Sequence, residues 1–389
     1  MVQHKQLVEV RKIMADFARL TGLASNETAS RRYLWTDAFA VCNYFSLYRQ
    51  GGQEADKQRA LDLIDQVHTN LGRHRRDDPR RGWISDLDQE DGENHPTRGG
   101  LRIGKNLNER PAGAPYQEAR EWEQDGQYFH YLTKWMHALE RAAVITGEPK
   151  YCRWAIELAK AAHAGFVYRD NQEGVKRMYW KMSIDLSRPL VTSMGHHDPL
   201  DALVTYHELR ACRRKHFAGQ EMPDLAPEIA DAEYMCRDRN WATDDPLGLG
   251  GLLFDACRVF QMALGGMEVT PVTPQHLIAD AHAGLGVFVR QNQLSIPADH
   301  RLAFRELGLS LGLRAVQKIK YLIESNERHT QSILSNEISS LLKAVPLADE
   351  IENYWSRPAS QKSQTWLDHR DINMVMLATS LLPKEFLSI

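Results

Sequence analysis

The feature that most constrains this chain is a succession of helical segments that alternate between two kinds. Apolar residues recur every three or four positions over segments of about 15 to 20 residues, and stretches rich in Gly, Pro, Asp and Asn separate these segments. The pattern predicts about twelve helices, over residues 4–20, 31–49, 54–72, 126–147, 148–166, 197–213, 225–238, 249–266, 274–291, 302–325, 328–344 and 367–381.

Every second segment differs from its neighbours in how its apolar residues are distributed. Segments such as 4–20 and 54–72 carry charge along one face, which is typical of helices at a protein surface. Segments such as 249–266 and 367–381 are apolar nearly all round and must be buried on most sides. Six outer–inner pairs predict an all-α fold of six helical hairpins, an (α/α)6 toroid with the apolar helices as its inner ring. A stacked-hairpin solenoid remains an alternative, because no repeated sequence motif separates the two.

Two connections are much longer than the usual few residues. We expect one domain over residues 1–389, with insertions at 73–125 and 168–195. The second insertion contains "GVKRMYWKMSIDLSRPLVTS", whose Val, Met, Tyr, Trp and Ile residues predict a small β-hairpin. Long insertions in compact domains are often lids or binding loops, so both insertions are candidates to border a site.

Charge and cysteine content exclude several classes of partner. The net charge of -3 indicates neither a nucleic-acid nor an acidic-membrane partner. The sequence lacks a run of about 18 apolar residues and a secretory N-terminus, so we expect no membrane helix and no signal peptide. The five cysteines are widely spaced in helical segments, which indicates buried thiols in a reducing compartment, the cytoplasm. We expect a small-molecule substrate and no cofactor; the oligomeric state stays open.

The stretch "SMGHHDPLDAL" supports two interpretations. As a metal site, its ligands would be His196, His197, Asp198 and Asp201. As a helix start, Asp198 is the N-cap, Pro199 takes the first helical position, and Asp201 favours the helix dipole. No HExxH or CxxC spacing accompanies the histidines, so we expect no metal and place both histidines just outside the helix.

In a toroid all inner helices run the same way, so residues at their starts converge at one end. These starts are rich in acids, histidines and aromatic residues, as a sugar site requires: sugar rings stack on aromatic faces and carboxylates accept from hydroxyls. The candidate catalytic residues are Asp37, Glu123, Asp125, His196, His197, His369 and Asp371. The candidate substrate-binding residues are Trp35, Trp122, Gln127, Tyr128, Tyr131, Trp180 and Arg370. The fourth and fifth starts add Asp244, Asp245, His300, Arg301 and Arg305.

This layout resembles the six-hairpin glycosidase-like superfamily over the whole chain, by architecture and by the placement of aromatic and acidic residues. The resemblance implies a glycoside hydrolase in which two carboxylates flank the scissile bond. The best matches to that role are Asp37, Glu123, Asp125, Asp198 and Asp371, without a defined pair. Because a helix N-terminus lowers a carboxyl pKa, we expect Glu123 to be a better proton donor than Asp198.

Two other functions stay open. The layout is also similar to relatives of N-acylglucosamine 2-epimerase, which implies that histidines move protons next to a sugar carbonyl. His196, His197 and His369 would then be the acid/base groups, and Arg370 the substrate clamp. Alternatively, the chain is a non-catalytic helical binding module, with "RHRRDDPRR" as a docking segment; a solvated loop explains that run more simply.

Overall fold

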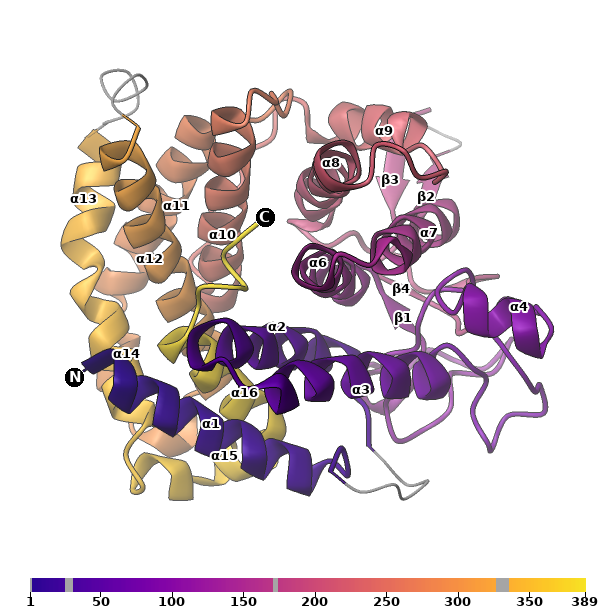
Figure 1. Ribbon diagram of the computed structural model, residues 1–389, viewed down its shortest axis with the longest axis horizontal. Coiled ribbons are helices and arrows are strands. Elements are labelled where there is room, and N and C mark those ends of the chain that lie inside the picture. The colour runs from indigo at the N-terminus through magenta and orange to yellow at the C-terminus, as the bar shows by residue number, and fades with distance from the viewer. Residues whose placement is uncertain (1, 25–30, 171–173, 327–335) are drawn as a thin grey trace. The chain divides into compact units, whose positions relative to one another are not determined.

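A computed structural model describes residues 2–24, 31–170, 174–326 and 336–389 (Figure 1). Most of these residues are helical, and the strands are few and short. The chain divides into two compact units, which we describe one at a time. Unit 1 comprises Met1–Leu20, Ser46–Gly52 and Arg237–Ile389, and unit 2 comprises Thr21–Phe45 and Gln53–Cys236. The prediction of a single domain stays a prediction.

Unit 2 contains three of the predicted inner helices and three outer ones. The inner helix α6 packs against α7 and α8, and α8 packs against α9, as Figure 1 shows. Two short helices lie in the first insertion. The helices of this unit are α2 (Leu34–Gly51, with residues 46–51 in unit 1), α3 (Glu54–Leu71), α4 (Gln89–Asn94), α5 (Glu118–Glu123), α6 (Phe129–Thr146), α7 (Pro149–Phe166), α8 (Asp198–His216) and α9 (Ala226–Cys236).

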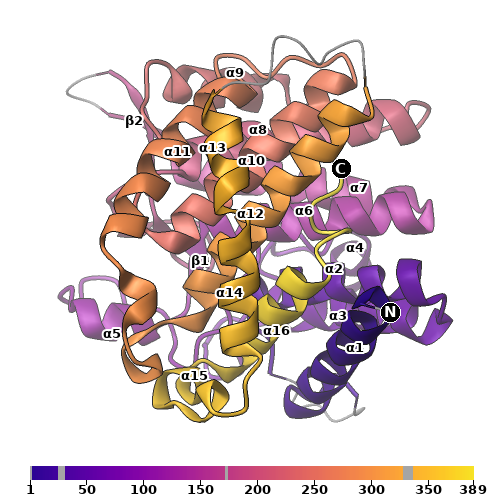
Figure 2. The ribbon, with the colours of Figure 1, turned by 90° about the vertical axis from the view of Figure 1, so that its left-hand side faces the viewer.

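Unit 1 is built around α12, which packs against α10, α14 and α16. Helices α10 to α13 lie side by side (Figures 1 and 2), and α1 packs against α16. The helices of this unit are α1 (Val2–Leu20), α10 (Pro246–Leu264), α11 (Pro274–Arg290), α12 (Ala303–Glu324), α13 (Asn336–Ala344), α14 (Pro346–Trp355), α15 (Gln364–Asp368) and α16 (Arg370–Leu381). Short 3₁₀ turns include η1 (Gln293–Ser295) and η2 (Ala298–His300).

Each predicted helical segment coincides with a helix of the structure. The segment predicted at 328–344 is described only from residue 336, and its first part lies outside the described residues. The sequence pattern missed α4, α5, α14 and α15, because helices of 5 to 10 residues are too short to show a clear period.

The inner helices are buried, as predicted, and α10 illustrates why. Asp245 caps it by accepting from the backbone N–H of Gly248 at 2.9 Å, and Pro246 fills the first position. Leu253 and Phe254 are then almost fully buried, and each such side chain contributes about 1.5–3 kcal/mol. By length and composition α10 could cross a membrane, but 67% of its apolar window is buried inside the protein. We therefore interpret it as the core helix of unit 1.

The outer helix α7 is more buried than its amphipathic pattern predicts, because the first insertion covers it. The Nε1 of Trp154 donates to the carbonyl of Asn94 at 2.7 Å. The carboxylate of Glu157 lies 2.7 Å from Nδ1 of His95 and 3.2 Å from a guanidinium nitrogen of Arg98. Residues 73–125 therefore do not form a loose loop: they pack onto α7 within unit 2 and carry two short helices.

The predicted β-hairpin in the second insertion is present. Strands β4 (Lys181–Met182) and β5 (Pro189–Val191) pair antiparallel, and β1 (Gln127–Tyr128) joins them on the β4 side. A second hairpin pairs β2 (Val167–Arg169) with β3 (Lys176–Met178). Because β1 leads directly into α6, the insertion fixes the position at which this inner helix begins.

Candidate functional site

In unit 2 the starts of three inner helices meet. The hydroxyls of Tyr33, just before α2, and Tyr131, in the first turn of α6, lie 2.8 Å apart. In the residue before Tyr131, Nδ1 of His130 lies 3.8 Å from Oδ1 of Asp198, the first residue of α8. These contacts agree with the prediction that the starts of the inner helices converge.

Aromatic rings cover this meeting point. Tyr128 stacks on His130 with ring centroids 5.4 Å apart, and Tyr131 meets Tyr128 edge-on at 5.2 Å. Trp122 is 45% exposed and meets Trp180 edge-on at 5.8 Å. We call the following residues the aromatic cluster: Tyr33, Trp35, Trp122, Tyr128, His130, Tyr131 and Trp180. Five of the seven predicted substrate-binding residues belong to it, the exceptions being Gln127 and Arg370.

Asp198 behaves differently from the sequence prediction. The N-cap of α8 is His197, and no side chain caps the helix, so the assignment of Asp198 as the cap is wrong. The Asp198 carboxyl is buried, and its Oδ2 has no hydrogen-bond partner among the described residues. Burial and the nearby charge of Asp201 raise the pKa of Asp198 to about 7, against the lowering that we expected from the helix dipole.

Burial dominates the pKa of Asp198 because few nearby groups stabilise the ionised carboxylate. The cation nearby, Lys134, forms its 2.7 Å ion pair with Asp201. A Cβ added at Gly195 would lie 2.4 Å from Oδ2, so the backbone before α8 closes over the carboxyl. A carboxyl with a pKa near neutrality is suited both to accept and to release a proton at neutral pH.

His130 is a residue that sequence reasoning did not single out. Its side chain is 31% exposed, and burial among the rings of the cluster lowers the pKa of its imidazole to about 4. It is therefore neutral at pH 7, beside the partly protonated Asp198. The stretch "DGQYFHYLTKW" contained the signal, because His130 stands between the two selected tyrosines.

Lys105, from the first insertion, was also missed. Its Nζ lies 5.5 Å from the ring centroid of Tyr33, and burial lowers the pKa of its ammonium group. Arg75 fixes the backbone here by donating to the carbonyls of Lys105 and Asn106 at 2.5 and 2.8 Å. Among the described residues no carboxylate lies within ion-pair distance of Lys105, so its charge faces the aromatic cluster without a salt bridge.

Asp125 and Gln127 hold the fold together. Oδ2 of Asp125 accepts from Arg102 at 2.5 Å and Arg75 at 3.3 Å, and its Oδ1 accepts from two backbone N–H groups. The Gln127 amide accepts from one backbone N–H and donates to two carbonyls. Both side chains are fully buried, and these bonds tie the first insertion to the start of α6. We therefore assign neither residue a role in catalysis or substrate binding.

The other predicted acids and histidines of unit 2 lie at helix ends. Asp37 is buried and accepts from the backbone N–H of Tyr33 at 2.9 Å, so it stabilises the start of α2. Glu123 is exposed at the end of α5. His196 and His197 lie just before α8 with ring centroids 4.7 Å apart, next to Asp198.

Unit 1 brings together the starts of the other three inner helices. Arg305 of α12 forms an ion pair with Asp245, the N-cap of α10. The backbone N–H of Phe304 donates to the side chain of Asn373, in α16, at 2.9 Å. A cavity of about 400 Å³ lies at the starts of α10 and α12, as the convergence of these helices predicts.

His369, Arg370 and Asp371 surround the start of α16. His369 is the N-cap, without a side-chain cap bond, whereas Asp368 ends α15 and accepts from Gln364 at 2.6 Å. The His369 ring lies 5.6 Å from that of Phe304. Arg370 is exposed, and Asp371 is half-buried.

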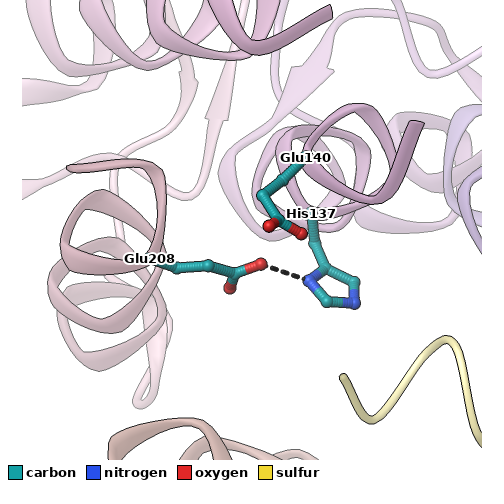
Figure 3. Close-up of side chains that lie close together, drawn as sticks. All are labelled: His137, Glu140 and Glu208. Atoms are coloured by element: carbon teal, nitrogen blue, oxygen red, sulfur yellow. Dashed lines mark hydrogen bonds and ion pairs between the residues drawn. The ribbon is translucent and has the colours of Figure 1, made fainter. Parts of the chain in front are cut away.

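In the described part of the chain, one group of side chains has metal-like proximity, and it differs from the one considered in the sequence. Ligand atoms of His137, Glu140 and Glu208 lie within 4.8 Å of one another (Figure 3). However, Nδ1 of His137 is 2.6 Å from Glu208, and Arg141 donates to both oxygens of Glu140 at 2.5 and 2.7 Å. These partners satisfy the group, and the guanidinium opposes a cation, so we assign it a structural role.

Comparisons with known proteins bear on the fold. No family model and no curated protein matches the sequence. A sugar epimerase from a ruminal bacterium is 11% identical, with a TM-score of 0.51 over 96% of this chain and 98% of its own. A cellobiose 2-epimerase from Spirochaeta thermophila is 11% identical, with a TM-score of 0.49 over 97% and 98%. The first match shows a shared fold; the second is too distant to carry an argument.

Proposed function

We propose that this protein is a sugar-active enzyme of the epimerase or isomerase type, built as an (α/α)6 toroid. The observation that carries the proposal is Asp198: a buried carboxyl with a pKa of about 7, beside His130 and the aromatic cluster. The epimerase likeness of the fold supports the same class of chemistry.

The chemistry needs a base that removes the proton from the carbon next to a sugar carbonyl. Above its pKa, the Asp198 carboxylate accepts this proton, and the protonated acid returns it. Return to the opposite face of the same carbon gives the epimer, and return to the former carbonyl carbon gives the isomer. His130, neutral at this pH and 3.8 Å from Asp198, is placed to relay the proton.

Removal of that proton leaves negative charge on the substrate oxygen, which a nearby cation stabilises. Among the described residues, three lysines border the aromatic cluster, and two of them form ion pairs or hydrogen bonds with other groups. Lys134 is paired with Asp201, and Lys181 is fully buried and donates to Glu121 and Gln124. Lys105 has no such pair within the part of the chain that the structure describes, so we propose that its ammonium group stabilises the developing oxyanion.

The glycoside hydrolase interpretation loses its main support. It requires two carboxylates that face the substrate, and one of the sequence candidates, Asp125, uses both carboxylate oxygens in bonds that hold the fold together. The acid/base role moves from His196, His197 and His369 to Asp198 and His130, whereas the aromatic residues keep their proposed role in binding sugar rings.

The test is exchange of carbon-bound hydrogen. The protein is incubated with aldoses and ketoses in deuterated water, and NMR follows deuterium incorporation next to the carbonyl and the appearance of the epimer or isomer. We expect kcat/KM to rise with pH with an apparent pKa near 7, because the base must be ionised. Asp198→Asn should lower kcat by about 10²- to 10⁴-fold.

Lys105→Met tests the second role, with Lys343→Met in α13 as the control for loss of a lysine outside unit 2. We expect Lys105→Met to lower kcat more than it raises KM, because the charge it stabilises develops in the transition state. Sugar turnover that is unaffected by Asp198→Asn, or release of reducing ends from oligosaccharides without exchange, would reject the proposal.

A further inference from the structure

Two charged pairs join the inner helices α6 and α8 near their starts. The first is His130 and Asp198, whose atoms Nδ1 and Oδ1 lie 3.8 Å apart. The second lies one turn further along both helices, where Nζ of Lys134 is 2.7 Å from Oδ1 of Asp201. Steps of four residues on α6 and three on α8 keep both pairs on the facing sides of the two helices. The proposed proton transfer uses only the first of these pairs.

The second pair is well shielded from water. The side chains of Lys134 and Asp201 are 12% and 10% exposed, and Oγ1 of Thr133 lies 3.5 Å from Oδ2 of Asp201. Charges in such surroundings are screened much less than charges at the surface, so they act strongly on their neighbours. The ion pair also links α8 to α6 one turn beyond Asp198, and it thereby helps to hold Asp198 opposite His130.

The charged and titratable groups that face Asp198 in the described part of unit 2 come from α6, from α8 and from the segment just before α8. They are His130 and Lys134, then Asp201, and then His196 and His197. Burial has the largest effect on the pKa of Asp198 and raises it; the charge of Asp201 raises it further, and the charge of Lys134 lowers it. The pair therefore applies two opposite charges to the same carboxyl.

We propose that Lys134 and Asp201 are positioning residues for Asp198: their ion pair fixes the start of α8 against α6 and holds two opposite charges beside the base. The inference rests on the proposed function, because that function makes Asp198 the base. Without Lys134, the carboxylates of Asp198 and Asp201 would lie near each other without this cation, and Asp198 would hold its proton more tightly. Without Asp201, the ammonium group of Lys134 would act on Asp198 alone, and Asp198 would release its proton more readily.

Two single substitutions should therefore change the pKa of Asp198 in opposite directions. Lys134→Met should raise this pKa by about one unit or more, and Asp201→Asn should lower it by about one unit. The double variant removes both charges and should return the pKa close to the wild-type value, a reversal that a merely structural ion pair would not produce. Lys160→Met is the matched control, because Lys160 of α7 forms a 2.7 Å ion pair with Glu228 of α9, also within unit 2. It should leave the pKa of Asp198 unchanged.

The pKa of Asp198 is measured in the full-length protein without a substrate. Urea unfolding at pH values from 4 to 9 compares each variant with the same variant carrying Asp198→Asn. The stability gained from Asp198→Asn grows with pH until native Asp198 is ionised and then becomes constant. The pH at which it becomes constant should lie near 7 in the wild type and the control, higher in Lys134→Met and lower in Asp201→Asn.

Exchange of carbon-bound hydrogen then connects this pKa to catalysis. The pH profile of kcat/KM should move with the pKa of Asp198 in each variant, because only the ionised base accepts the proton. At pH 6, Lys134→Met should therefore have a kcat/KM about 10-fold below that of the wild type, and at pH 9 the two should be similar. A loss of the same size at both pH values would contradict a role through the charge of Asp198.

The two measurements separate this inference from the proposed function. A pKa of Asp198 that is unchanged in both single variants, or that moves in the same direction in both, would overturn the inference. If Lys134→Met does not fold, the lowered pKa in Asp201→Asn and the wild-type value in the double variant are still required. The expected pKa changes without hydrogen exchange in any sugar would reject the proposed function and retain the control of the Asp198 proton by this pair. Exchange that depends on Asp198 in a protein whose pKa values do not move would do the reverse.

Discussion

At the scale of single residues, Asp198 shows two opposing effects on one carboxyl. The first turn of a helix favours the ionised acid, which is why the sequence predicted a cap with a lowered pKa. Burial beneath the Gly195 backbone and the charge of Asp201 disfavour the ionised form. These two effects outweigh the helix dipole, since the pKa of Asp198 rises to about 7. The same environment that costs stability makes the group suitable for proton transfer.

This cost gives a stability prediction. The ordinary pKa of Asp is about 3.9, so from pH 4 to 7 native Asp198 keeps a proton that the unfolded chain has lost. Its stabilising contribution is complete below about pH 4 and is lost as the pH rises to about 7. Asn cannot ionise, so Asp198→Asn should be more stable than the wild type at pH 8, by up to about 4 kcal/mol, with little difference at pH 4.

Urea unfolding at a series of pH values measures this difference. Asp62→Asn, at an exposed position in α3, is the control for removal of one negative charge. A stability difference between Asp198→Asn and wild type that does not grow between pH 4 and 8 would show that the native carboxyl ionises normally.

At the scale of elements, helix contacts depend on where small residues fall. In α10, a Cβ at Gly250 would lie 2.0 Å from the carbonyl oxygen of Gly308 in α12. A Cβ at Gly312 would lie 2.7 Å from the Cα of Gly250. The backbones of the two inner helices therefore touch at this crossing, and the next residue, Gly251, has open space around its Cα.

The pair Gly250 and Gly251 offers a matched test of this crossing. Gly250→Ala should destabilise the protein by about 1–3 kcal/mol or more, because α10 and α12 must move apart. Gly251→Ala should be neutral or stabilising by up to about 1 kcal/mol, because Ala favours the helix. Thermal or urea unfolding measures the change in stability of each variant relative to the wild type. Equal changes for Gly250→Ala and Gly251→Ala would mean that α12 does not restrict α10 at Gly250.

At the scale of the whole molecule, each unit collects three inner-helix starts. In unit 2, residues Tyr33, Tyr131 and Asp198 mark these starts, and in unit 1 Asp245, Phe304 and Asn373 do so. A six-hairpin ring requires its inner helices to start at one end, and within each unit the three starts meet this requirement.

A closed ring that folds as one domain has a calculable size. For a compact chain of 389 residues we expect a radius of gyration of about 21 Å. Small-angle X-ray scattering in dilute solution measures it, with a concentration series to exclude association. A clearly larger monomer value, or a scattering curve with two separated maxima in its distance distribution, would indicate that the units do not close on each other.

The sequence by itself determined the helices and much of the aromatic cluster. The period of the apolar residues decides which faces are buried, and this information is local, so α10 and the β-hairpin at 181–191 could be predicted. The aromatic residues at the helix starts, such as Tyr128 and Tyr131, followed once the inner helices were assumed to run the same way.

Only the tertiary structure decided what each polar group does. Asp125 and Asp198 are both acids at the start of an inner helix, yet the first accepts from two arginines and the second has an oxygen that bonds to no other described residue. Lys105 reaches the cluster because an insertion folds back onto the helix starts. Partners that come from distant parts of the chain set burial and charge, and these control the pKa; sequence spacing does not encode either.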